Sequence, residues 1–257
     1  MNQRSYDKLK KNKENLQEEY EKGKRDAQLV QDFLKRKLKE SFEEITEDNL
    51  INLTTVFIQY CIYPRMMFST QDSLFAFHFF RTLHHHRVPN FNILHTLAQF
   101  LKSIVPSIHC CTMVESDNLG IFFLEVFTLI NEWSRPDMWE QHCEGYIGFS
   151  KIVGNSQVIK VNEFQQIGDS IQRRFTLNIV ECFKNPVQGS MKTQCALKIV
   201  NRLLSQYPTI LKFAQFLSQQ LQELVDSGIK GKDQKLYTLA LACKNNLDKK
   251  ILTMNKG

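Results

Sequence analysis

Apolar residues recur every three to four positions along most of the chain, which is the spacing of one face of an α-helix. The spacing is clearest over residues 91–105, 164–179, 210–224 and 236–251, and residues 119–133 are apolar almost throughout. No comparable stretch alternates apolar and polar residues with the period of two that marks a half-buried β-strand. The pattern therefore predicts an all-α fold.

Proline marks the turns between these predicted helices. The 257 residues include 10 glycines and 6 prolines, and the prolines are Pro64, Pro89, Pro106, Pro136, Pro186 and Pro208. Long helices joined by short turns pack as antiparallel hairpins, and hairpins stacked in chain order form an α-solenoid. Because no strict sequence period appears, the expected architecture is an irregular HEAT-like α-solenoid of stacked helical hairpins, preceded by a long charged helix.

Composition divides the chain into four regions. Charged side chains dominate residues 1–45, whereas residues 46–143 and 162–257 carry a front and a back set of amphipathic hairpins. Between the two sets, residues 144–161 hold three of the ten glycines, which predicts an irregular connection.

The first region predicts a helix that needs a partner. Residues 1–44 hold 12 Lys and Arg residues and 10 Asp and Glu residues, with no proline. A heptad pattern gives an apolar seam, but Gly23 interrupts it and Lys13 and Lys37 occupy its ends. Such a seam is too thin for a self-sufficient coiled coil, so we expect the helix to dock on the body of this chain or on another protein. A solvated helix without a partner stays open as the alternative.

Positive charge within this helix gathers in two clusters, one over residues 8–13 and one formed by Lys35, Arg36, Lys37 and Lys39. Such clusters attract phosphate groups. However, glutamates lie directly beside both clusters, and residues 1–44 have a net charge of only +2 within the +6 of the whole chain. The sequence signatures of RNA-recognition, KH and OB folds are missing. We therefore interpret the second cluster as a candidate phosphate or partner contact and not as a dedicated nucleic-acid reader.

The motifs of common enzymes and metal sites are missing from the sequence. It contains no GxGxxG or GxxxxGK[ST] loop, no HExxH pair and no GxSxG elbow, so we expect neither an enzyme nor a cofactor. The run His84–His86 does not predict a metal site, because adjacent helical side chains point about 100° apart. His109–Cys111 and His142–Cys143 each offer two ligands, but nothing at a regular spacing supplies the rest.

Cysteine usage and hydropathy favour an intracellular protein. The seven cysteines form no CxxC pair and most lie among apolar residues, which is typical of reduced, buried thiols. The first residues are basic but lack the apolar run of a signal peptide. Residues 119–133 are shorter than the ~20 residues of a membrane span and are interrupted by Glu125, Asn131 and Glu132, so they predict a buried helix.

One segment is specific enough to indicate a family. Residues 57–69 read FIQYCIYPRMMFS, which closely resembles the pattern F-[IL]-Q-x-C-[IL]-[FY]-P-R-x-x-[FL]-S of the THO complex subunit 2 family. The signature residues are Gln59, Cys61, Tyr63, Pro64, Arg65, Phe68 and Ser69. Further similarities follow in the order of the family: Pro89-Asn90-Phe91, Trp133, Cys143, Gly145-Tyr146, Gly148-Phe149, Tyr207-Pro208 and residues 236–240. The charged first helix is also similar, whereas the histidine run is a departure.

The resemblance implies a function that composition does not reveal. Members of this family are helical scaffolds of the nuclear THO/TREX assembly, which couples transcription to mRNA packaging and export. The implied partners are other THO subunits and a DEAD-box RNA helicase, and the chain would be a piece of the C-terminal half of such a scaffold. Contact with mRNA would be weak or indirect, because the long basic tail of the family is not present in this sequence. Another helical interaction scaffold, or a weak RNA-binding module, remains the alternative.

The signature also has a physical interpretation as a packed corner between two helices. We expect Pro64 to end one helix and Ser69 to cap the next. Phe57, Cys61 and Phe68 are expected to pack beneath the turn, and Arg65 to hydrogen-bond the last carbonyls of the helix over residues 49–62. Whether the segment is such a corner or a partner contact is left open by the sequence.

Overall fold

The computed structural model describes residues 3–43, 53–151, 157–184, 186, 190–227, 229 and 231–254. Helices form nearly all the regular structure of these residues, and the β-type pairing among them is one isolated antiparallel bridge between Ser150 and Val158. The all-α prediction is therefore confirmed. The division into front and back hairpin sets, and their stacking as a solenoid, remain predictions.

The chain forms two compact units, Met1–Ile45 and Thr46–Gly257. The first unit is one helix, α1 (Gln3–Glu43), which is the predicted long charged helix. Most of its apolar side chains are exposed, with Leu16 65% and Tyr20 68% accessible. A single helix has no surface of its own against which to bury such a seam, so packing within the unit does not explain these residues.

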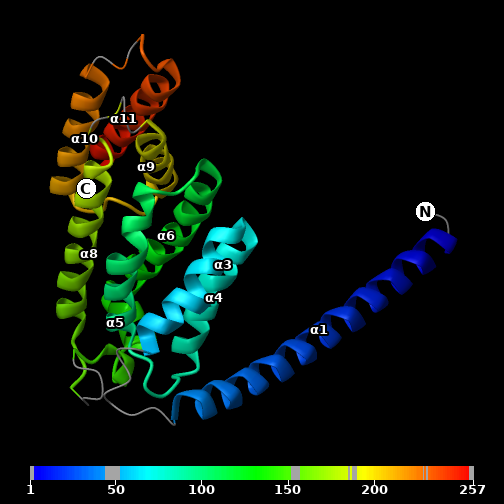
Figure 1. Ribbon diagram of the computed structural model, residues 1–257. Helices are drawn as coiled ribbons and strands as arrows, with labels where there is room; N and C mark the ends of the chain where they lie inside the picture. The colour runs from blue at the N-terminus through cyan, green and yellow to red at the C-terminus, as the bar shows by residue number, and fades with distance from the viewer. Residues whose placement is uncertain are drawn as a thin grey trace. The chain divides into compact units, whose positions relative to one another are not determined.

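The second unit consists of packed helices and short helical turns (Figure 1). The α-helices are α3 (Tyr63–Phe68), α4 (Thr70–His85), α5 (Ile93–Gln99), α6 (Met113–Trp133), α7 (Pro136–His142), α8 (Val161–Glu181), α9 (Ser190–Leu203), α10 (Leu211–Asp226) and α11 (Gln234–Met254). The π-turns are η1 (Ile58–Ile62) and η2 (Phe100–Ile104), and the 3₁₀ turns are η3 (Val105–His109) and η4 (Ile147–Phe149).

Side-chain caps fix where several of these helices begin. Ser69, Asn92 and Thr112 each accept a hydrogen bond from a backbone N–H in the first turn of α4, α5 and α6, respectively. Thr112 and Glu115 also form a reciprocal capping box at the start of α6. These bonds satisfy N–H groups that have no partner within the helix.

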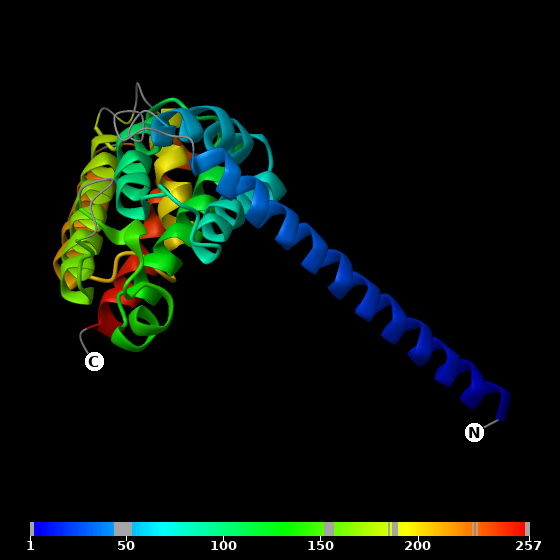
Figure 2. The same cartoon turned by 90° about the horizontal axis from the view of Figure 1, so that it is seen from below.

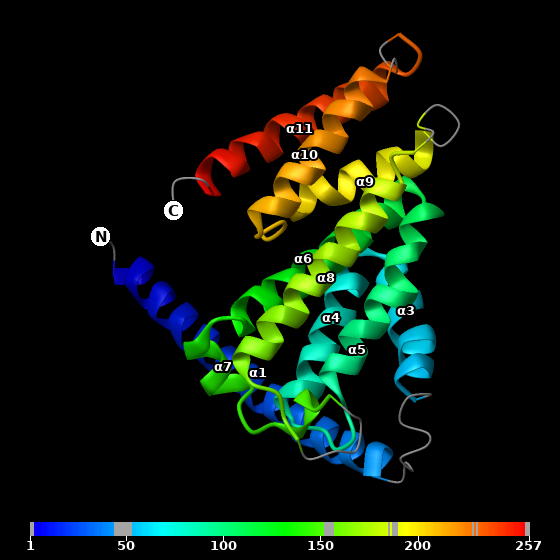
Figure 3. The same cartoon turned by 90° about the vertical axis from the view of Figure 1, so that its left-hand side faces the viewer.

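Helix α6 forms the centre of the second unit. It packs against α3, α4, α7, α8 and α9. Seen from below, α3 and α4 lie on the opposite side of the unit from α8 (Figure 2), and a second side view shows α10 and α11 together at one end (Figure 3). The α6 side chains Phe123 and Phe127 are almost inaccessible, and the ring centre of each lies 5.1 Å from that of Phe175 on α8. Residues 119–133 are therefore the buried helix that the sequence predicts.

The two π-turns explain how proline is accommodated inside a helical path. η1 ends two residues before Pro64, and η2 ends two residues before Pro106. In both turns a backbone N–H bonds to the carbonyl five residues earlier, from Tyr63 to Ile58 and from Val105 to Phe100. A proline ring would clash with the carbonyl four residues earlier in a regular α-helix, and the wider turn provides room for it. The expectation that Pro64 ends a helix is therefore wrong, because the helical path continues to Phe68.

Candidate interaction surface

The signature segment is a helix with two opposite apolar rows. The helical path runs from residue 53 through η1 and α3 to Phe68. Ile58, Ile62 and Met66 are at most 1% exposed and form the inner row. Val56, Tyr60, Pro64 and Phe68 also follow one another at intervals of four, and all are exposed; we call these four residues the outer ridge. Residues four apart share a helix face, so both rows are continuous.

Exposure along the outer ridge is large for apolar side chains. Tyr60 is 76% accessible, Phe68 82% and Val56 49%. The neighbouring helix α4 contributes Phe75, which is 50% accessible and whose ring stacks on that of Phe79 at 6.1 Å between centres. Adjacent exposed aromatic side chains are more typical of interaction surfaces than of a solvated helix face.

Arg65 is held beside this ridge by two contacts. Its Nε donates a hydrogen bond to Oδ1 of Asp72 at 3.0 Å, and its guanidinium carbon lies 4.3 Å from the centre of the Phe75 ring. Asp72 in turn accepts a bond from the Ser69 hydroxyl at 2.7 Å, and its own N–H donates to Ser69 Oγ at 3.1 Å. The cap, the carboxylate and the guanidinium therefore form one network at the turn between α3 and α4.

The structure corrects part of the packed-corner interpretation. Ser69 caps the following helix as expected, and Phe57 is half-buried, 6.1 Å from Phe79 between ring centres. Cys61 and Phe68, however, are exposed because they lie away from the inner row. Arg65 binds Asp72 of the next helix, since that carboxylate lies close to its guanidinium, and not the carbonyls of the preceding helix.

The remaining signature residues differ in their exposure. Gln59 and Pro64 are exposed, and Tyr63 is half-buried. The signature therefore combines an inner row that packs within the second unit with an outer side that is exposed on that unit. Its role in partner contact remains a prediction.

The second candidate set lies on α1. Lys35, Arg36, Lys37 and Lys39 are all exposed. The guanidinium of Arg36 lies 5.9 Å from the centre of the Phe33 ring, and Lys37 pairs with Glu40 at 2.8 Å. The cluster thus presents cations next to an aromatic side chain, and its contact with phosphate or a partner remains a prediction.

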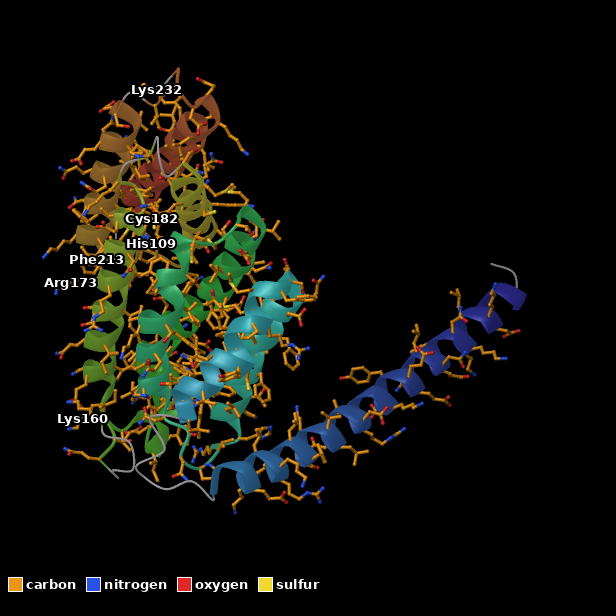
Figure 4. All side chains as sticks on the ribbon, in the orientation of Figure 1. His109, Lys160, Arg173, Cys182, Phe213 and Lys232 are labelled. Carbon is orange, nitrogen blue, oxygen red and sulfur yellow. The ribbon has the colours of Figure 1, made fainter. Side chains whose placement is uncertain are left out.

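The structure brings together one thiol and one imidazole that the sequence gives no reason to pair. Cys182 follows α8 and His109 ends η3, and the two lie next to each other (Figure 4). The sulfur is 3.7 Å and 3.8 Å from the two ring nitrogens and donates a hydrogen bond to the Asn178 carbonyl at 3.3 Å. Burial raises the pKa of Cys182 to about 12, and burial also lowers the pKa of His109. A protonated, buried thiol is not an activated nucleophile, so the pair is a packing contact.

The histidine run is split between core and surface. His84 is 7% exposed, and its ring centre lies 4.6 Å from that of Trp133 and 5.1 Å from that of Tyr146, whereas His85 is exposed. Burial lowers the pKa of His84 to about 4. Throughout the described ranges, no three His, Cys, Asp or Glu side chains gather as metal ligands would. Nor does any helix in those ranges have the length and apolar character needed to cross a bilayer.

Comparisons with known proteins agree on one family. Residues 1–247 match the family model described as transcription factor/nuclear export subunit protein 2. THO complex subunit 2 of Homo sapiens is 25% identical over 237 residues, covering 88% of this chain and 15% of the relative. Its counterpart from Arabidopsis thaliana is 28% identical over 216 residues, covering 80% and 12%. The protein of that name from Saccharomyces cerevisiae is 37% identical over 75 residues, covering 28% and 4%.

The chain therefore spans 15% or less of the length of these curated relatives. No solved structure matches the chain significantly.

Proposed function

The chain belongs to the transcription factor/nuclear export subunit protein 2 family, and on that premise we propose that it acts as a non-enzymatic scaffold segment of a nuclear THO complex. In that role it holds subunits of the assembly that couples transcription to the packaging and export of mRNA. The observation that carries the proposal is the family match over residues 1–247, together with relatives that are named as subunits of one complex.

The surfaces of the chain are consistent with partner binding. The second unit buries its apolar residues around α6 yet exposes Tyr60 and Phe68 on the outer ridge. The first unit is a helix whose apolar seam has no core of its own. Exposed apolar surface on both units is expected of a segment that is completed by other proteins.

The chemistry of the described side chains also favours holding partners over turnover. The Cys182–His109 contact lacks an ionised thiol, since burial raises the pKa of Cys182 to about 12. We expect the partners to be other THO subunits and a DEAD-box RNA helicase, and any contact with mRNA to be weak or indirect.

Affinity purification from nuclear extract tests this proposal. The tagged chain should recover other THO subunits and the DEAD-box helicase, identified by mass spectrometry. Deletion of residues 1–44 should reduce that recovery, because α1 is proposed to be a docking element. The same deletion should have less effect on the thermal stability of residues 47–252. Recovery of cytoplasmic or membrane proteins alone would reject the nuclear assignment. Equal recovery with and without residues 1–44 would remove α1 as a contact.

A second candidate function, weak RNA binding, rests on the exposed cluster Lys35, Arg36, Lys37 and Lys39. Phosphate contacts release counterions, so affinity for RNA should fall steeply with salt. Replacing the four residues with alanine should abolish that salt-dependent binding if the cluster contacts phosphate. The same variant should recover THO subunits unchanged if the cluster serves RNA alone.

A further inference from the structure

We propose that the outer ridge, together with Phe75 and Arg65, binds an amphipathic α-helix of a partner protein, and that acidic residues flank the apolar stripe of that helix. The proposal rests on the proposed function in one respect, that the chain works by holding partners. It adds which surface does so and the chemistry of what it holds.

The two ends of the second unit differ in their outward faces. α11, which packs on α9 and α10, exposes mostly polar or charged side chains such as Lys235, Asn245 and Lys249. The signature helix instead exposes Tyr60 and Phe68. In a stack of helices, the terminal helix needs a polar outer face to keep the protein soluble. An apolar outer face on a terminal helix is therefore expected to be covered by a further helix. The outer ridge therefore fits a surface that is covered in the assembly.

The outer ridge also has the geometry of a helix-binding surface. A row of exposed apolar side chains at intervals of four, with Phe75 on the next helix, matches the apolar stripe of a second helix laid alongside it. Tyrosine and arginine are also the residue types on which binding energy concentrates at protein interfaces. The row offers two large aromatic anchors, Tyr60 and Phe68, of which more than three quarters is accessible to a partner.

The exposed charge of the signature helix is positive. Arg65 is the one Asp, Glu, Lys or Arg residue among positions 53–68. The carboxylate of Asp72 is half-buried and already bound to Arg65, whereas the side chain of Arg65 is 52% exposed. This charge favours carboxylates on the partner.

Arg65 is also pre-oriented to receive a carboxylate. Its Nε–H is used by Asp72, and the ring of Phe75 supports the guanidinium at 4.3 Å. A guanidinium presents five N–H groups in a fixed plane, so further donors remain for a carboxylate oxygen. Because the side chain is already ordered, less conformational entropy is lost on binding.

An RNA strand fits the same surface less well. Strands are bound by aromatic stacking combined with a run of cations that follows the phosphates. The ridge has one guanidinium beside it, that of Arg65, and its row includes Val56 and Pro64, which offer no aromatic face to a base. A protein helix uses all four positions.

A pair of synthetic helices tests the proposal on the full chain. Both peptides carry the same leucine stripe, flanked by glutamate in one and by lysine in the other, and binding is measured by fluorescence anisotropy. The glutamate peptide should bind more tightly than the lysine peptide. Phe68→Ser and Tyr60→Ser should each weaken its binding about tenfold or more, the loss expected for an interface anchor. Arg65→Gln should lower the preference for glutamate by up to about fivefold.

Matched controls lie on α8, on the opposite side of the second unit from α3. Leu177 is 50% exposed, so Leu177→Ser removes exposed apolar area elsewhere and should leave binding unchanged. Arg173, which Figure 4 shows on α8, is exposed, and Arg173→Gln should leave the glutamate preference unchanged. Thermal midpoints of all variants should stay close to that of the parent chain.

Three outcomes would overturn the proposal. The first is equal binding of the two peptides, and the second is an unchanged affinity of Phe68→Ser for the glutamate peptide. The third is binding of single-stranded oligouridylate that is lost in the ridge variants but not in the α8 controls. Because the assay uses purified components, its outcome is distinct from that of the nuclear pull-down. A chain that binds the glutamate peptide but recovers no THO subunit would keep the ridge and reject the complex. The reverse pattern would keep the complex and reject the ridge as the helix-binding surface.

Discussion

Helix α6 and the signature helix, which spans residues 53–68, are both rich in apolar residues, but they use them differently. α6 is surrounded by other helices, and Leu119, Phe122 and Phe127 are at most 1% exposed. The signature helix buries its inner row and leaves Phe68 82% exposed on the outer ridge. Core packing accounts for the apolar character of α6 over residues 119–133. In the signature helix it accounts for the inner row, and the outer ridge is the apolar surface of the second unit for which we propose a partner.

The same substitution in the two helices should give opposite results. Phe123→Asp in α6 places an unpaired carboxylate in the core, at a cost of several kcal/mol, and should unfold the second unit. Phe68→Asp should change the free energy of unfolding by no more than about 0.5 kcal/mol, because that side chain is mostly in water. Thermal unfolding followed by circular dichroism measures both. An unchanged midpoint for Phe123→Asp would show that α6 is not the core.

Acid should destabilise the second unit through His84, a buried side chain of α4 that packs on Trp133 of α6. Burial lowers the pKa of His84 from 6.5 to about 4, so below pH 6.5 the unfolded chain binds a proton that the folded chain does not. Stability is therefore full above pH 6.5 and falls as the pH drops from 6.5 towards 4, by about 2 kcal/mol at pH 5. Denaturant titrations at pH 7 and pH 5 measure the loss.

Two histidine variants isolate this effect from the titration of carboxylates. His84→Gln should lose less stability than the parent chain between pH 7 and pH 5, whereas His85→Gln, at an exposed position, should behave like the parent. An identical pH dependence in His84→Gln and the parent chain would contradict the burial of this imidazole.

The smallest effect is expected at the turn that joins the signature helix to α4. Ser69→Ala removes the oxygen that accepts the Asp72 N–H and should cost about 1 kcal/mol in the free energy of unfolding. Gln71→Ala, at an exposed position of the same turn, should cost nearly nothing. Equal effects of the two substitutions, measured by urea unfolding, would argue against the cap.

Periodicity is enough to predict the helices, because each buried face repeats locally along the chain. The cap at Ser69 follows from its side-chain chemistry and its distance from Asp72. What cannot be predicted is which of two opposite apolar rows faces the core. Ile58 and Tyr60 both begin rows with a spacing of four, and only the position of α4 and α6 decides between them.

Two further features lie outside local sequence reasoning. Proline usually ends a helix, and the π-turn that accommodates Pro64 leaves no recognisable mark in the sequence. Cys182 and His109 are 73 positions apart, so their contact depends on the packing of α8 against η3. For the outer ridge, the signal in the sequence is the resemblance of residues 57–69 to a family pattern, which locates the segment without showing its exposed side.

The most direct test of the account compares three chains in one quantitative pull-down from nuclear extract: the parent, Phe68→Ser and Leu177→Ser. If the chain is a THO scaffold segment that holds a partner through the outer ridge, the parent and Leu177→Ser should recover THO subunits equally. Phe68→Ser should lose at least one of those subunits while keeping the parent thermal midpoint. Equal recovery by all three chains would contradict the ridge as a contact surface. Absence of THO subunits from all three would contradict the scaffold assignment itself.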